Sequence, residues 1–211
     1  MEDPRLIDAL RAQGIRDERV LGAMAALNRA DFVEVDERDR AWRDEPLPIG
    51  ECQTISQPYV VARMTQAAEV QPGERVLEVG TGSGYQTAVL LGLGAEVFTI
   101  EVRPALADRA GERLRKLSNS NLHTRVGDGW LGWSEAAPFD AILLTAAPEE
   151  VPTALLSQLR RGGGRMVGPV GPLHAPQQLV RIIRHADDSF GTEELLAVRF
   201  VPMVRGLPGA G

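Results

Sequence analysis

The chain has 211 residues, enough for one domain with a full core but not for two comfortable ones. Its hydrophobic content of 44%, charged content of 25% and net charge of −6 are ordinary for a globular protein, and scattered basic residues exclude a nucleic-acid footprint. The single cysteine, Cys52, excludes a disulfide framework and a multi-cysteine metal site, and no apolar run approaches the roughly 20 residues of a membrane helix. We therefore expect a cytoplasmic protein without metal, nucleic-acid or membrane partners.

The N-terminal part predicts two helices, over residues 4–13 and 17–27. Gly14 provides a C-terminal stop for the first helix, and Asp17 can cap the second. The second helix carries apolar residues at helical spacing, which predicts that it packs against a core: Val20, Leu21, Met24 and Leu27.

The segment "PIGECQTISQPYVV", residues 48–61, predicts no regular element before the next helix. Between two proline-containing stretches it gathers more hydrogen-bonding side chains than a plain linker needs: Cys52, Gln53, Thr54, Ser56 and Gln57. We call it the lid segment, and we expect it to hold a ligand.

From Glu74 onwards, strands and helices alternate. The expected strands cover residues 75–80, 95–101, 122–128, 139–147 and 162–171, with helices over 83–94, 104–117 and around 151–160. This alternation predicts a doubly wound α/β fold with a parallel sheet covered on both faces. The last two strand-like runs, 177–185 and 194–204, have no helix between them and predict a hairpin at the sheet edge.

A glycine-rich loop, "EVGTGSGY" at residues 78–85, follows a strand and opens a helix. Glycines at 80, 82 and 84 let the backbone turn tightly and approach a nucleotide-type cofactor at the helix N-terminus. The dinucleotide pattern needs a glycine at its sixth position, where this loop has Tyr85. The acidic Glu78 also suits a cationic ligand better than a pyrophosphate. A dehydrogenase is therefore a weak interpretation.

Three carboxylates follow three successive predicted strands: Glu78, Glu101 and Asp128. Glu101 ends the second strand 21 residues after Gly80, where a carboxylate can accept hydrogen bonds from ribose hydroxyls. Asp128 can accept one from the exocyclic amine of adenine. We expect the three to face one crevice, and together with the glycine loop they indicate S-adenosylmethionine.

The chain also resembles the protein-L-isoaspartate (D-aspartate) O-methyltransferase family from about residue 17 to 204. The resemblance rests on "PLPIGECQTISQPYVVARMT", "VLEVGTGSGYQTAVL", "VGDGWLGWSEAAPFDAILLTAA", "QLRRGGGRMVGPVG" and "VRFVPMV". Many methyltransferases share the glycine loop, whereas "QTISQP" and "VRFVP" are far more specific to this family.

The resemblance implies a Rossmann-like, mostly parallel seven-stranded sheet of the class I methyltransferases, with N-terminal helices and a C-terminal hairpin. It implies one domain over 1–211, in which 1–60 form the helices and lid, 61–175 the cofactor core and 176–211 the hairpin and tail. The implied activity is methyl transfer from S-adenosyl-L-methionine, leaving S-adenosyl-L-homocysteine, to the free α-carboxylate of L-isoaspartyl residues. The ester then forms a succinimide that reopens partly to aspartate. Acceptance of D-aspartyl residues is left open.

The resemblance also assigns site residues in this chain. Ser56 lies beside the substrate carboxylate, Thr54 and Ile55 lie between cofactor and substrate, and Val201 and Pro202 form one wall of the peptide groove. The residues that would carry the cofactor are Glu78, Gly80, Thr81, Gly82, Ser83, Gly84, Glu101, Asp128 and Gly129. The expected partners are peptides and unfolded or aged proteins that contain isoaspartate, and a monomer is expected.

The chain departs from the family at Cys52, where glycine is usual. A side chain there restricts the lid segment and puts substrate breadth in doubt, not cofactor binding. Two other hypotheses stay open: a carboxyl methyltransferase for a normal aspartate in one dedicated peptide, and a nucleotide-binding module without catalysis. The first should carry a further recognition module, and Ser56 with the full glycine loop argues against the second.

Overall fold

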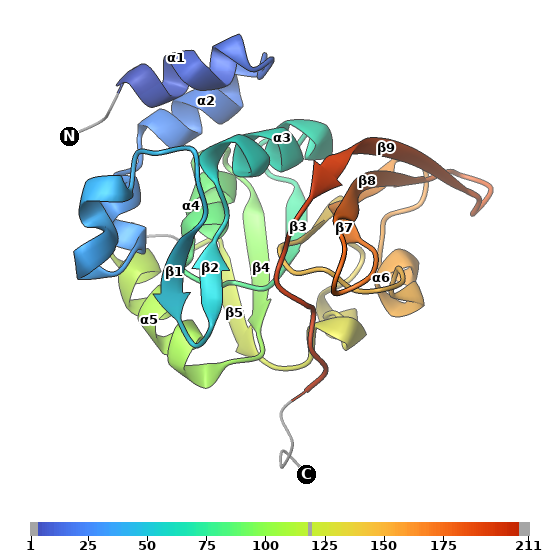
Figure 1. Ribbon diagram of the computed structural model, residues 1–211. Helices are drawn as coiled ribbons and strands as arrows, with labels where there is room; N and C mark the ends of the chain where they lie inside the picture. Colours follow the sequence, from blue (N-terminus) through green and yellow to red (C-terminus); the bar gives the residue numbers. More distant parts are fainter. Residues whose placement is uncertain (1–3, 118–119, 207–211) are drawn as a thin grey trace.

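The computed structural model describes residues 4–117 and 120–206 and has an α/β architecture (Figure 1). The helices are α1 (Pro4–Ala12), α2 (Glu18–Ala25), α3 (Pro58–Ala68), α4 (Tyr85–Gly92), α5 (Pro104–Arg115) and α6 (Thr153–Ser157). The strands are β1 (Leu47–Gly50), β2 (Gln53–Ile55), β3 (Arg75–Val79), β4 (Glu96–Glu101), β5 (Leu122–Val126), β6 (Ala141–Leu144), β7 (Gly164–Val170), β8 (Gln177–Arg184) and β9 (Phe190–Val198). No helix of the described residues is long and apolar enough to cross a bilayer.

Seven strands form the main sheet in the order β5-β4-β3-β6-β7-β8-β9. The pairs among β3 to β7 are parallel, whereas β8 and β9 are added antiparallel at one edge. The predicted doubly wound, mostly parallel sheet with a C-terminal hairpin is therefore confirmed. The chain enters the sheet at β3, builds outward to β5 and then returns to the other side of β3. The ends of β3 and β6 thus form the switch point where ligands bind in such sheets.

Alternation along the central strands sends side chains into two separate cores. Val76 of β3 joins the core with the N-terminal helices, α3, α4 and α5, whereas the next residue, Leu77, joins the core with α6. The predicted helix 17–27 is shorter than expected, but Asp17 does cap it, since its carboxylate accepts a hydrogen bond from Arg19 N at 2.9 Å. Both faces of the sheet are covered, as the alternating pattern predicted.

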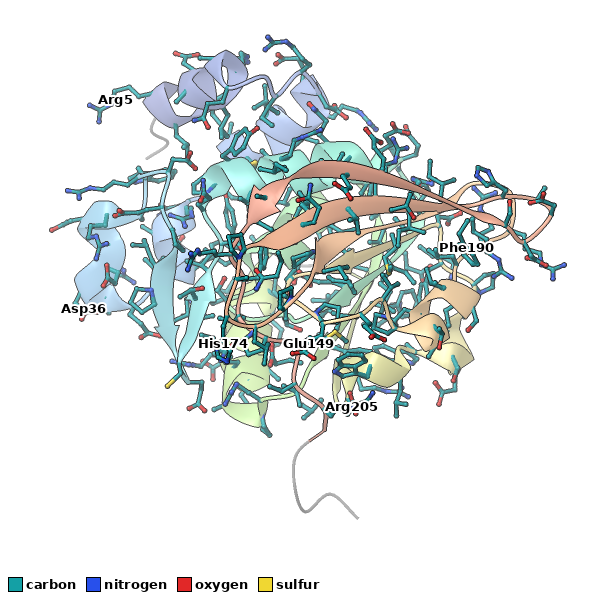
Figure 2. The ribbon with its side chains drawn as sticks, turned by 45° about the vertical axis from the view of Figure 1, so that its right-hand side comes forward. Arg5, Asp36, Glu149, His174, Phe190 and Arg205 are labelled. Atoms are coloured by element: carbon teal, nitrogen blue, oxygen red, sulfur yellow. The ribbon has the colours of Figure 1, made fainter. Side chains whose placement is uncertain are left out.

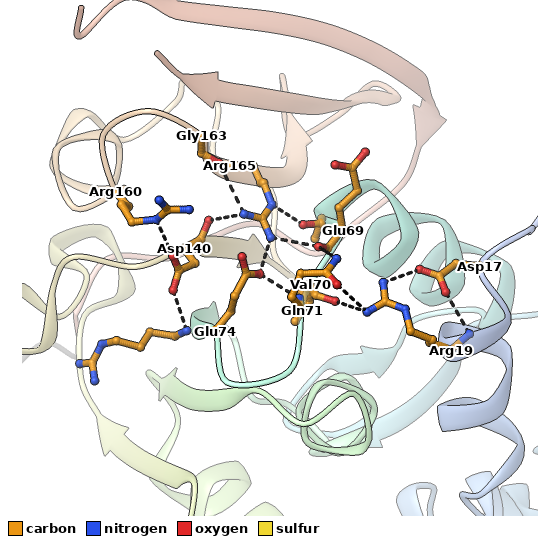
Figure 3. Close-up of polar contacts among 12 residues, drawn as sticks. Asp17, Arg19, Glu69, Val70, Gln71, Glu74, Asp140, Arg160, Gly163 and Arg165 are labelled. Carbon is orange, nitrogen blue, oxygen red and sulfur yellow. Dashed lines mark hydrogen bonds and ion pairs between the residues drawn. The ribbon is translucent and has the colours of Figure 1, made fainter. Parts of the chain in front are cut away.

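A polar cluster centred on Arg165 closes the end of the sheet where β3, β6 and β7 begin (Figure 3). Its guanidinium is ion-paired with Glu74 and donates hydrogen bonds to the carbonyls of Ala68 at 2.6 Å and Glu69 at 3.1 Å. Asp140 accepts from Arg75 N at 3.0 Å and from Arg160 Nε at 2.6 Å. These contacts tie the end of α3 to the sheet and leave the opposite end for the site.

The C-terminal hairpin differs from the expected one. Its second strand runs over Phe190–Val198 instead of 194–204, and pairs with β8 from Arg184↔Phe190 to Gln177↔Val198. The start of this strand, "FGTE", has no apolar alternation, but the backbone ladder does not require any. After Val198 the chain leaves the sheet. Pro202 then forms an isolated β-bridge with Ala147, which follows β6 in the sequence. Figure 2 shows Phe190 at the far end of the β8–β9 ribbon and Arg205 on the departing segment.

The lid segment contains a small hairpin that its sequence did not predict. β1 and β2 pair antiparallel around a turn in which Glu51 and Cys52 both have positive φ, +52° and +55°. This geometry is typical of a two-residue hairpin turn, which normally uses Asn-Gly or a similar pair. Because Glu-Cys is not such a pair, the turn could not be read from the residues.

Candidate active site

Two adjoining hollows lie at the carboxyl ends of the central strands. The inner cavity is lined by the glycine loop, Glu101, the lid segment and residues 201–204. The outer groove lies between the lid segment, α3 and residues 196–201. Four residues line both hollows: Thr54, Ser56, Thr145 and Val201. We call these four the junction. The inner cavity and the outer groove therefore adjoin at these four residues.

The glycine loop forms the floor of the inner cavity. Gly80 and Gly82 have φ of +101° and +54°, which glycine adopts without strain. A Cβ on Gly80 would lie 2.3 Å from Thr145 Oγ1, and one on Gly129 would lie 2.3 Å from Val79 Cγ1. Gly84 is different, because it begins α4 and packs against Leu114 of α5 instead of lining the cavity. The loop thus brings bare backbone to the cavity surface.

Glu101 is the one predicted carboxylate that faces the inner cavity. Its side chain is 5% exposed, and both oxygens are oriented by backbone donors. Oε2 accepts a hydrogen bond from Gly82 N at 2.8 Å, and Oε1 accepts one from Arg103 N at 3.0 Å. Each carboxylate oxygen can accept a further hydrogen bond. Glu101 is therefore positioned to bind hydroxyl groups of a ligand.

Glu78, by contrast, is fully buried below the glycine loop and does not line the cavity. Alternation along β3 points its side chain toward α4. There Oε2 accepts a hydrogen bond from Thr87 Oγ1 of α4 at 2.5 Å and another from Thr99 Oγ1 of the neighbouring β4 at 2.7 Å. Among the described residues, Oε1 has no hydrogen-bond partner. Burial raises the pKa of Glu78 to about 7, with a smaller contribution from the charge of Glu101. The expectation that this carboxylate faces the crevice is therefore not met.

Replacing Glu78 by glutamine is expected to change how stability depends on pH. Because the folded pKa of about 7 exceeds the ordinary 4.5, folding favours the protonated acid, and this stabilisation is complete below about pH 4.5. It is lost as the pH rises through 7, by about 3 kcal/mol in total. The variant lacks this group, so its free energy of unfolding relative to wild type should rise over the same range. Urea unfolding of both proteins from pH 4.5 to 8 tests this, and a constant difference would contradict it.

Asp128 is directed to the C-terminal segment instead of the cavity. Its Oδ1 accepts from Trp130 N at 2.9 Å, and its Oδ2 accepts from Gly206 N at 3.0 Å. Trp130 holds the same segment, since its Nε1 donates to Met203 O at 3.1 Å and its ring lies 4.4 Å from the Arg205 guanidinium. The neighbouring Gly129 does line the cavity. The carboxylate can reach a cavity ligand only through its remaining lone pairs.

The lid segment is fastened on both sides. Arg109 of α5 donates to Ile49 O at 2.9 Å, and Asp44 accepts from Tyr59 N at 2.8 Å. Cys52 is exposed in the turn and lines neither hollow. Its consequence is backbone strain of about 1–2 kcal/mol, because a side chain disfavours positive φ. A glycine at this position would avoid that strain.

The other predicted site residues do line the inner cavity: Thr54, Ile55, Ser56, Gly80, Thr81, Gly82, Ser83, Glu101, Gly129, Val201 and Pro202. The sequence analysis missed Thr145, which follows β6 and donates to Val79 O at 2.9 Å and Gly80 O at 2.5 Å. Its place at a strand end is the same signal that pointed to Glu101.

The inner cavity fits the cofactor that the sequence indicates. The backbone of Gly80 and Gly129 leaves room that a Cβ would fill, and Glu101 offers acceptors for a ribose. Below the loop, Oε1 of Glu78 is, within the described residues, a buried acceptor without a hydrogen-bond partner, and the carboxyl group could become ionised beside a cationic ligand above it. A sulfonium with an amino-acid tail and an adenosine matches this donor and acceptor set.

Comparisons with known proteins agree with this geometry. The family model described as "Protein-L-isoaspartate(D-aspartate) O-methyltransferase (PCMT)" matches residues 1–207. The chain is 57% identical over 198 residues to the protein-L-isoaspartate O-methyltransferase of Myxococcus xanthus (strain DK1622), covering 93% of each chain.

Two solved structures are also similar. A protein-L-isoaspartate O-methyltransferase superposes with a TM-score of 0.84 at 26% identity, over 94% of this chain and 65% of that chain. The putative enzyme of Plasmodium falciparum in complex with S-adenosyl-L-homocysteine has a TM-score of 0.81 at 23% identity, over 97% and 99%. The second comparison shows the same fold.

Proposed function

Because the chain belongs to the protein-L-isoaspartate(D-aspartate) O-methyltransferase family, we propose that the junction between its two hollows is where a methyl group is transferred to isoaspartyl residues. The protein is an S-adenosylmethionine-dependent methyltransferase that acts in protein repair. The methyl group goes to the free α-carboxylate of an L-isoaspartyl residue. The observation that carries this proposal is that Ser56 and its three neighbours line both hollows.

The inner cavity is the cofactor site in this proposal. S-adenosylmethionine supplies a methyl group bound to a positively charged sulfur. Glu101 accepts hydrogen bonds from the ribose, and the backbone of the glycine loop, with Thr54 and Ile55, encloses the rest. Gly129 leaves room for the adenine, and Asp128 could accept a hydrogen bond from it only through the lone pairs that Trp130 N and Gly206 N leave free. Glu78 acts from below the loop as an anchor for Thr87 and Thr99, and a bound cation would favour its ionised form.

The outer groove receives the peptide. Val201 forms one wall, held in place by two hydrogen bonds of 2.8 Å, from Ala147 N to Val201 O and from Met203 N to Ala147 O. Pro202, the other residue expected in this wall, lines the inner cavity instead. Ser56 donates its hydroxyl hydrogen to the substrate carboxylate, and within the described residues this hydroxyl has no other hydrogen bond. In this arrangement the peptide stays in the outer groove, and its α-carboxylate, bound by Ser56, faces the inner cavity.

The reaction does not require proton transfer to or from the protein's acidic and basic side chains. A carboxylate is already ionised near neutral pH, because its pKa lies around 4, so no general base is needed. The residues of the junction align the two reactants and exclude water, and such alignment is worth on the order of 7 to 11 kcal/mol relative to free encounter. This accounts for a site with no catalytic dyad beside Ser56.

Two synthetic peptides that differ only in an isoaspartyl or an aspartyl linkage test the proposed function. Each is incubated with the protein and methyl-labelled S-adenosylmethionine, and base-labile methyl ester is counted. We expect ester on the isoaspartyl peptide alone. Ester on neither peptide, with cofactor still bound, would favour a dedicated acceptor or a module without catalysis.

The proposal includes the setting in which the enzyme works. Its acceptors are isoaspartyl sites in unfolded or aged proteins and in peptides, with D-aspartyl residues as a further candidate. The acidic net charge of −6 and the scattered basic residues support a protein that acts without nucleic acid. We place it in the cytoplasm as a monomeric single domain.

A further inference from the structure

Arg29 is a buried cation directly behind the lid segment. It begins the 3-10 turn Arg29–Phe32 and is fully buried. Its guanidinium donates hydrogen bonds to three carbonyl groups, those of Ala41, Glu45 at 3.2 Å and Ser56 at 3.1 Å. The guanidinium thus joins the N-terminal segment to the residue that lies at the junction.

No carboxylate of the described residues pairs directly with this charge, although the charges of Asp44 and Glu45 act on it from further away. Among the described residues, no carboxylate lies within ion-pair distance of Arg29, and its Nε has no hydrogen-bond partner. The acids whose charge acts on it are engaged elsewhere: Asp44 accepts from Tyr59 N at 2.8 Å, and Glu45 pairs with Arg40 at 3.0 Å. Tyr85, whose ring lies 5.8 Å from the guanidinium carbon, stays neutral because burial raises its pKa to about 12.

A buried cation without an ion-pair partner is costly for the fold. Burial lowers the pKa of Arg29, yet a guanidinium remains protonated in proteins at physiological pH. Its charge therefore persists in a region of low dielectric, where an anion nearby would be strongly attracted. The one anion that the proposed function brings to this region is the substrate carboxylate, held by Ser56.

We propose that Arg29 is a positioning residue that orients Ser56 through its carbonyl group and attracts the substrate carboxylate across the lid segment. This inference rests on the proposed function of the junction. Arg29 lines neither hollow, so it acts through Ser56 and through its charge, without touching the substrate. Coulomb attraction across the lid segment, reduced by solvent screening, is expected to have an effect on the order of tenfold on binding.

The charge of Arg29 favours substrate binding and does not lower the barrier of the chemical step. In the transfer, a carboxylate oxygen forms a bond to the methyl carbon as the carbon–sulfur bond breaks, and its electron pair stays on sulfur. The negative carboxylate and the positive sulfonium become a neutral ester and a neutral thioether, and no proton moves. Because the negative charge fades along this path, Arg29 stabilises the bound substrate more than the transition state or the ester. It lowers KM and assists release of the product.

The test compares two peptides that differ only at the isoaspartyl residue, one with its α-carboxylate and one with a neutral α-carboxamide. Their dissociation constants are measured in the presence of S-adenosyl-L-homocysteine for wild type, Arg29→Met and Arg29→Lys. Arg38→Met is the matched control, because Arg38 is an exposed arginine of the same N-terminal segment. Cofactor affinity and thermal stability are measured for each variant.

We expect wild type and Arg38→Met to bind the carboxylate peptide about tenfold more tightly than the carboxamide. Arg29→Met should lose this preference and keep its affinity for S-adenosyl-L-homocysteine, and Arg29→Lys should keep part of the preference. If both peptides lose affinity equally in Arg29→Met, Arg29 only supports the fold and the inference is overturned.

Two further outcomes remain decisive. If Arg29→Met does not fold, Arg29→Lys decides, since a preference for the carboxylate peptide equal to that of wild type overturns the inference and a reduced preference supports it. If wild type fails to methylate the carboxylate peptide at all, the proposed function fails. That result is distinct from an active enzyme that ignores the carboxylate charge.

Discussion

Gly80→Ala is expected to abolish cofactor binding, lowering the affinity for S-adenosyl-L-homocysteine by a factor of about 100 or more. The new Cβ would lie 2.3 Å from Thr145 Oγ1, a distance that real side chains do not adopt. Thr145 cannot move away freely, because its hydroxyl donates to Val79 O at 2.9 Å and Gly80 O at 2.5 Å. The backbone of the glycine loop must therefore shift to remove the clash, and this backbone forms the floor of the cavity.

Gly14→Ala separates this clash from backbone strain. Gly14 has φ +97°, close to the +101° of Gly80, but a Cβ there would meet no atom within 4 Å. Both variants should lose about 1–2 kcal/mol of stability through the unfavourable φ. Only Gly80→Ala should lose cofactor binding. Calorimetric titration and urea unfolding of the two variants measure these effects, and wild-type affinity in Gly80→Ala would show that the loop is not the cofactor floor.

Ser56→Ala is expected to reduce kcat/KM for an isoaspartyl peptide by about ten- to a hundredfold. A hydrogen bond to a charged carboxylate contributes roughly 1.5–3 kcal/mol, and the variant removes that bond without enlarging the side chain. The rest of the junction stays in place, because the carbonyl of Ser56 and not its hydroxyl binds Arg29. Cofactor affinity should therefore stay at the wild-type value.

Ser157→Ala is a suitable control, since Ser157 is an exposed serine of α6 whose hydroxyl donates to Ala154 O at 2.7 Å. Its activity should equal that of wild type. Initial rates with increasing peptide, together with a titration of S-adenosyl-L-homocysteine, distinguish the expected result from general damage. An unchanged kcat/KM in Ser56→Ala would remove Ser56 from the site.

Gly80→Ala and Ser56→Ala probe the two sides of the same junction. Thr145 holds the cofactor loop from one side, and Ser56 reaches over from the lid segment. Arg29 lies behind Ser56 and connects it to the N-terminal segment. In the proposed function, methyl transfer depends on three segments far apart in the sequence: the lid segment, the residues after β6 and the N-terminal segment that carries Arg29.

Local patterns in the sequence were sufficient for most of the fold. The alternation of apolar strands and helices from Glu74 predicted the parallel sheet, because the period of a strand and of a helix is a property of neighbouring residues. The hairpin of the lid segment and the start of β9 were missed, since Glu51–Cys52 and "FGTE" carry no local signal for strands. Both form strands because their backbone pairs with a neighbouring strand: β1 with β2, and β9 with β8.

The sequence by itself determined the glycine loop, the carboxylate of Glu101 and the lid segment around Ser56. Each depends on residue types at short spacing after a strand, and the loop geometry follows from the glycines themselves. Only the tertiary structure decided which carboxylates face the cavity, because one step of alternation buries Glu78 and a contact with Gly206 occupies Asp128. It also decided the position of Arg29, whose hydrogen bonds reach residues 12, 16 and 27 positions away. Such contacts follow from how distant segments pack, and no local pattern contains them.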